Sequence, residues 1–96
     1  MLTLRLPSAL TAVEAEAFAG TKVQVVDLSG TKCTIIADRA FQNAGALRQV
    51  ILPATVESIS ENAFSGCDYV QIICPAGSKA AQYAQENGIP WMDINP

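Results

Sequence analysis

Residues 39–73 read RAFQNAGALRQVILPATVESISENAFSGCDYVQII, and this stretch contains the same pattern twice. In each copy, an Ala-Phe pair is followed by a small residue three positions after the Phe and then by an aliphatic run. A third Ala-Phe pair occurs at residues 17–18, so Phe18, Phe41 and Phe64 are 23 residues apart. A fixed period of this length in residues of the buried type is the sequence signature of a repeat architecture.

Other columns of buried-type residues keep the same step, which strengthens the repeat. These columns are Leu10, Cys33 and Val56; Val13, Ile36 and Ile59; and Thr21, Ala44 and Cys67. The first copy is one residue shorter between its Phe and its strand. With that shift the inward strand positions align as Val26, Val50 and Ile73, followed by Leu28, Leu52 and Pro75.

A period of 23 residues lies in the range of leucine-rich repeats, in which each unit is one strand plus a return segment. One unit is too short to bury its own apolar face, so stacked units share a continuous core. The sequence therefore predicts an α/β leucine-rich repeat solenoid with short parallel strands and irregular or short helical returns. We expect one domain over residues 1–96, with about three repeats. The predicted repeats cover residues 6–27, 28–51 and 52–75, and a C-terminal cap covers residues 76–96.

The tail contains the signals of a capping helix. Gly77-Ser78 provides a turn and a helix N-cap, and Asn87-Gly88 provides a stop. Between them, the apolar face consists of Ala80, Ala81, Tyr83 and Ala84. A helix that is apolar on one side and polar on the other suits the end of a repeat stack.

The unit LPATVESISENAFSGCDYVQII, residues 52–73, resembles the BspA-type leucine-rich repeat, with its Leu-Pro, its Ile-containing return and its Ala-Phe-x-x-Cys turn. The resemblance covers residues 6 to 75, and Cys67 occupies the family's cysteine position. Earlier copies depart from the pattern, with Ala44 and Thr21 at that position and Ser29 in place of proline. The resemblance implies a bacterial or protist surface or secreted protein used in adhesion or host contact, and the C-terminal part of a longer array. It supplies no fixed ligand residues.

Composition excludes several other classes of function. Six basic and nine acidic residues give a net charge of −3, which argues against a nucleic-acid or anionic-membrane surface. The chain has no histidine, so Ser-His and Cys-His catalytic arrangements are excluded. We expect no catalytic residues, no cofactor and no metal site. No apolar run is long enough to cross a bilayer, and the first residues lack the features of a signal peptide.

The three cysteines fit neither a disulfide framework nor a zinc site. We interpret them as thiols that behave as small hydrophobic side chains. The predicted register buries Cys33 and Cys67 and turns Cys74 outward.

The outward strand positions form the candidate binding site. In the predicted alignment they make two rows: Thr3, Val25, Gln49 and Ile72, and Arg5, Asp27, Ile51 and Cys74. Arg5 and Asp27 are expected to be neighbours across two strands. These rows carry few charges and no aromatic rings, a composition that favours a protein partner over a sugar or a nucleic acid. A surface selected only for β-propensity would also contain Val and Ile.

Two hypotheses follow, from different classes. In the first, the chain is a non-enzymatic protein-interaction module of a cell-surface or secreted bacterial protein. In the second, it is a structural spacer or C-terminal capping segment of a larger protein, with no ligand of its own. The N-terminal end begins within a strand without a polar cap, so we also expect self-association through that end or fraying of residues 1–12.

Overall fold

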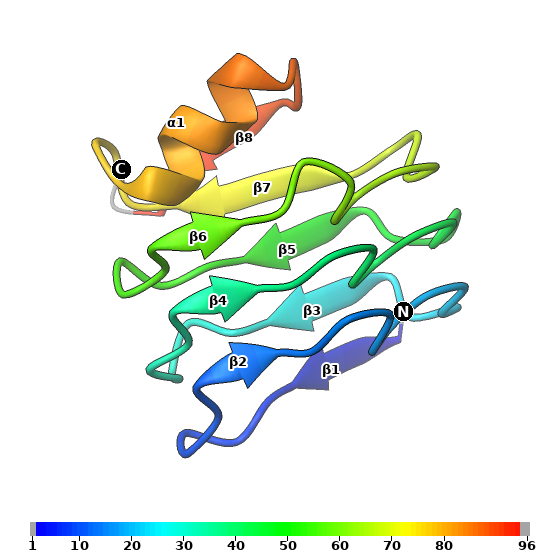
Figure 1. The fold of residues 1–96 in the computed structure, drawn as a ribbon, viewed down its shortest axis with the longest axis horizontal. Coiled ribbons are helices and arrows are strands. Elements are labelled where there is room, and N and C mark those ends of the chain that lie inside the picture. The colour runs from blue at the N-terminus through cyan, green and yellow to red at the C-terminus, as the bar shows by residue number, and fades with distance from the viewer. Residues whose placement is uncertain (1, 95–96) are drawn as a thin grey trace.

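The computed structural model describes residues 2–94, and the chain in this range forms a parallel β-solenoid (Figure 1). Two parallel sheets make up its walls. The five-stranded sheet contains, in spatial order, β1 (Thr3–Arg5), β3 (Val25–Asp27), β5 (Gln49–Ile51), β7 (Gln71–Cys74) and β8 (Trp91–Asp93). The three-stranded sheet contains β2 (Ala12–Val13), β4 (Ile35–Ile36) and β6 (Ser58–Ile59). The predicted solenoid of short parallel strands with irregular or short helical returns is thus confirmed, and each return segment also carries a two-residue strand.

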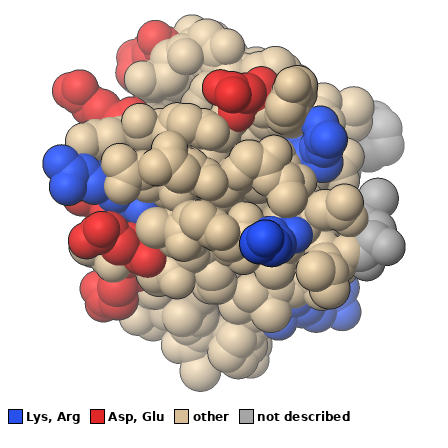
Figure 2. Space-filling view, turned by 90° about the vertical axis from the view of Figure 1, so that its right-hand side faces the viewer, with Lys and Arg blue, Asp and Glu red and all other residues tan. Residues whose placement is uncertain are grey.

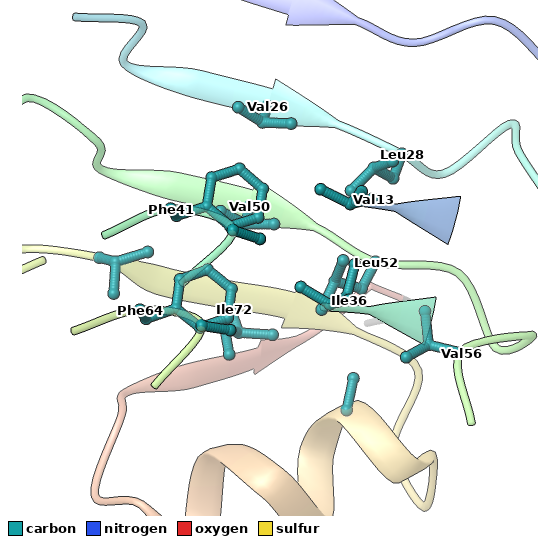
Figure 3. Packing of buried hydrophobic residues seen from close by; sticks show 14 of the residues in the cluster. Val13, Val26, Leu28, Ile36, Phe41, Val50, Leu52, Val56, Phe64 and Ile72 are labelled. Carbon is teal, nitrogen blue, oxygen red and sulfur yellow. The ribbon is translucent and has the colours of Figure 1, made fainter. Parts of the chain in front are cut away.

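The repeated phenylalanines form one column along the solenoid, as the constant step predicts. The rings of Phe18 and Phe41 lie 5.4 Å apart and nearly parallel, and those of Phe41 and Phe64 lie 5.1 Å apart with an interplanar angle of 1°. Figure 3 shows Phe41 and Phe64 one above the other, beside Val50 and Ile72 of the five-stranded sheet. Phe41 is completely buried, whereas Phe18, at the N-terminal end of the column, is only half-buried.

Helix α1 (Lys79–Glu86) covers the C-terminal end of the stack, at the top of Figure 1. The Ser78 side chain accepts a hydrogen bond from the Ala81 amide and caps the helix, as predicted. The four predicted apolar residues of the helix are buried. Tyr83 continues the aromatic column in a tilted orientation, with its ring 6.1 Å from that of Phe64.

The turn after each phenylalanine includes a residue in the left-handed backbone region, at Gly20, Asn43 and Gly66. Two independent constraints require glycine at position 66. Its φ is +79°, and a Cβ atom there would clash with Asn43 of the preceding turn. A Cβ at Gly20 would meet nothing, since no turn precedes it among the described residues. The turns are therefore packed directly on one another.

At the N-terminal end, Leu4, Leu6, Leu10 and Phe18 are all half-buried. Strand β1 is the edge of the five-stranded sheet on this side. The expected self-association through this end stays a prediction.

Candidate functional site

The outward side of the five-stranded sheet, here called the outer face, is defined by the strand register. Along each strand, side chains alternate between the core and solvent. Leu4, Val26, Val50 and Ile72 are aligned neighbours, and the last three are buried, so their row points into the core. The rows on either side point outward. One consists of Thr3, Val25, Gln49 and Gln71, and the other of Arg5, Asp27, Ile51, Ile73 and Met92.

Two predicted site residues do not belong to this face. Ile72 and Cys74 are completely buried, and their places in the outward rows are taken by Gln71 and Ile73. The cause is one residue of spacing. The third copy has one residue between Val70 and its first inward strand position, where the second copy has two between Leu47 and Val50. A slip of one residue turns every side chain of a strand to the opposite side.

The other six predicted residues lie in the outward rows. Val25, however, is only 7% exposed and offers little surface to a partner. Sequence reasoning missed Met92, because Trp91–Asp93 was not expected to form a fifth strand. Met92 is 53% exposed and lies beside Ile73.

Arg5 and Asp27 are paired, as the alignment predicts. Their side chains approach to 3.5 Å, with the Arg5 side chain 81% exposed and that of Asp27 14% exposed. Asp27 also accepts hydrogen bonds from the amide and hydroxyl of Ser29, at 2.9 and 2.6 Å. Burial alone would raise the pKa of Asp27, but the Ser29 hydrogen bonds and the Arg5 charge outweigh it and lower the pKa. The stabilisation from this carboxylate is therefore present above the ordinary aspartate pKa and is lost as the pH falls through the lowered value.

A second feature lies at the edge of the outer face. The Arg48 guanidinium carbon lies 4.6 Å from the centre of the Tyr69 ring, in a cation–π contact. Arg48 directly precedes β5, and Tyr69 lies two residues before β7. Tyr69 is 64% exposed, so this pair presents a large ordered side chain at the start of two neighbouring strands.

The cysteines differ from the sequence expectation at two positions. Cys33 is buried as predicted, whereas Cys74 is buried instead of exposed and Cys67 is half-buried instead of buried. The Cys67 thiol donates to the carbonyl oxygen of Phe41 at 2.8 Å. Burial raises the pKa of all three thiols.

We expect Cys67 to be the thiol that reacts first with iodoacetamide under native conditions. Because the reactive form is the thiolate and the pKa is raised, its labelling should be slow at neutral pH and faster at higher pH. Mass-spectrometric mapping after limited labelling measures the order. Labelling of Cys74 ahead of Cys67 would contradict the observed register of β7.

Within residues 2–94, no group of three or more His, Cys, Asp or Glu side chains could hold a metal ion. No helix in this same range is long and apolar enough to cross a membrane.

The fold and the stacked turns define a leucine-rich-repeat solenoid that presents a sheet surface. A family model described as the BspA type leucine rich repeat region matches residues 1–87 in six copies. The chain belongs to this family, which provides repeat modules for protein interaction and is associated with bacterial surface proteins. A search of curated proteins and a search of solved structures each found no match.

Proposed function

We propose that this chain is a non-enzymatic interaction module of a cell-surface or secreted bacterial protein, and that it binds a protein partner through the outer face. Membership of the BspA-type family supports the general role. Adhesion or host contact is the specific function that this role suggests.

The observation that carries the proposal is the aliphatic row across strands β5, β7 and β8. Ile51, Ile73 and Met92 are adjacent in the register, and none of them is fully buried. The two charges in this row, on Arg5 and Asp27, lie at its other end and neutralise one another. The centres of protein interfaces are depleted in charge and enriched in Met and aromatic residues. The end of the row formed by Ile51, Ile73 and Met92 shares the low charge and the Met with such centres, although it contains no aromatic residue.

The pair of Arg48 and Tyr69 extends the same surface. Tyr and Arg are among the residues that carry most of the binding energy at protein interfaces. The cation–π contact already orders the Tyr69 ring, so a partner would lose less side-chain entropy on binding it. The outer face thus combines an aliphatic centre with an ordered aromatic residue at its edge.

Substitution of the aliphatic row tests the proposal. Fluorescently labelled protein is applied to cultured epithelial cells, and bound fluorescence is measured by flow cytometry over a range of concentrations. We expect the double variant Ile51→Lys/Ile73→Lys to weaken binding by about tenfold or more, because two charges would be desolvated at the contact.

The matched control is Ile35→Lys. Ile35 is an exposed aliphatic residue of β4, in the opposite sheet, with 47% of its surface exposed. Circular dichroism checks that all variants fold. Equal binding by the double variant and by the Ile35 control would contradict a role for the outer face. If the unsubstituted chain does not bind at all, the alternative of a spacer or capping segment is favoured.

A further inference from the structure

The turns that contain the phenylalanines are joined by a regular ladder of backbone hydrogen bonds. The amides of Phe18 and Gly20 donate to the carbonyl oxygens of Ala40 and Gln42, both at 2.7 Å. One turn later, the amide of Phe41 donates to Ala63 O at 2.8 Å and the amide of Asn43 to Ser65 O at 2.7 Å. In both turns, therefore, two amides two residues apart donate to the carbonyls of the following turn, and in the first turn the Glu16 amide also donates, to Asp38 O at 3.2 Å.

The last turn contains the same two donors, on Phe64 and Gly66. Among residues 2–94, no oxygen accepts a hydrogen bond from either amide. The offset of 22 residues seen in the earlier turns would place the acceptors at Glu86 and Gly88. These residues instead form the end of α1 and the residue after its C-cap Asn87. The cap therefore ends the stack without closing the ladder.

A pocket of about 510 Å³ lies where the next turn would be. It is formed between the last turn and the short connection 87–90 that leads from α1 to β8. Phe64, Cys67 and Val70 line it on the side of the repeat, and Ile89 and Pro90 line it on the side of the cap. Phe64, which carries one of the two free donors, lines the pocket, and Gly66, which carries the other, lies in the chain between the lining residues Ser65 and Cys67.

The charge of the pocket is negative. Glu61 and Asp68 line it, and neither forms an ion pair within the described residues. Figure 2 looks onto the end of the molecule at which the turns lie, and acidic side chains lie at its upper left and near its top centre, toward the cap, with others along its left edge. Tyr83 also lines the pocket, and its hydroxyl donates to the carbonyls of Ser60 and Glu61 at 3.0 and 3.3 Å. Burial raises the pKa of Tyr83 to about 12, so this hydroxyl stays neutral near pH 7.

We infer that this pocket binds a segment of a partner protein that offers two main-chain carbonyl oxygens, two residues apart, together with a basic side chain. The carbonyls accept from the Phe64 and Gly66 amides, as Ala63 and Ser65 accept from the turn before. Main-chain pairing of this kind is how peptides extend existing backbone ladders. Glu61 and Asp68 disfavour an anionic ligand and receive the basic side chain. The pocket is separate from the outer face, so this inference does not depend on the function proposed above.

The probe is the heptapeptide acetyl-RAFQNAG-amide, which copies residues 39–45 and carries one positive charge. Its second and fourth residues correspond to Ala40 and Gln42, whose carbonyls accept from the first turn in the intact chain. The peptide is titrated into the ¹⁵N-labelled chain, and amide shifts are followed by two-dimensional NMR. We expect the amide protons of Phe64 and Gly66 to move downfield, while those of Phe18 and Gly20, which already donate, stay unchanged.

Two variants distinguish the pocket from general attraction between opposite charges. Glu61→Gln/Asp68→Asn should raise the Kd of the peptide by up to about tenfold, on the scale of two exposed ion pairs. Glu14→Gln removes an exposed carboxylate from the first turn and should leave the Kd within about twofold. A peptide with Glu in place of its Arg should bind more weakly. Absence of shifts at Phe64 and Gly66, or equal weakening by the Glu61/Asp68 and Glu14 variants, would overturn the inference.

Discussion

Phe41→Ala is expected to lower the free energy of unfolding by about 3–5 kcal/mol, on the scale of large-to-small substitutions in protein cores. The Phe41 ring is completely buried and lies between two parallel rings, at 5.4 Å from Phe18 and 5.1 Å from Phe64. Its removal would leave a cavity that two neighbouring turns line, and both turns would lose contacts. Phe18→Ala should cost less, because Phe18 is half-buried and, within residues 2–94, stacks on the Phe41 ring alone.

Urea denaturation followed by far-UV circular dichroism measures both losses on the same scale. Phe41→Leu serves as a control, because it keeps most of the buried volume and should recover part of the stability. Equal losses for Phe41→Ala and Phe18→Ala would contradict a column in which the middle ring carries two contacts.

The second large effect is expected at two adjacent isoleucines. Ile72→Ala should cost about 2–5 kcal/mol, because Ile72 is completely buried in the inward row of β7. Ile73→Ala should cost less than about 1 kcal/mol, because Ile73 points outward and is only partly buried. The two substitutions remove the same atoms from neighbouring positions, so each is the matched control for the other.

The same urea experiment decides between the observed register and the one that the 23-residue step suggests. If Ile73→Ala proves the more destabilising substitution, β7 is shifted by one residue and Cys74 faces outward. The outer face would then be made of the residues predicted from the repeat alignment.

The features that were predicted correctly from the sequence are each supported by residues at several separate positions. The phenylalanine column followed from a step repeated without change, and the rings do stack. The helix was predicted from its capping residues, with Ser78 as the N-cap and Gly88 just beyond the C-terminal end of the helix. The pair of Arg5 and Asp27 followed from the alignment of the first two strands, once the one-residue shift of the first copy was allowed for.

The register of β7 could not be predicted, because Ile72 and Ile73 are equally suited to the core. Which of them points inward depends on whether one or two residues lie between Val70 and the first inward position of the strand. The side chains at these positions favour neither spacing. The strands of the second sheet are two residues long, too short to show an alternating pattern. Strand β8 could not be predicted either, because it directly follows Pro90 and is formed only by its pairing with β7, which is a tertiary contact.

The pocket at the cap was also beyond sequence reasoning, for a physical reason. Its existence depends on the path of residues 87–90, which connect the helix to β8 without forming another turn of the solenoid. The repeat pattern indicates how each turn of the solenoid packs on the preceding and following turns. It contains no information on how the chain departs from the pattern after Tyr83.

Hydrogen exchange at matched amides of successive turns tests most directly the claim that the turns form one ladder that stops at the cap. NMR gives the protection factors of Phe41 and Asn43, which donate to the following turn, and of Phe64 and Gly66, which occupy the same positions in the last turn. We expect strong protection at Phe41 and Asn43 and little at Phe64 and Gly66. Weak protection at Phe41 would mean that the turns are not stacked in this register. Protection at Phe64 equal to that at Phe41 would mean that the cap closes the ladder.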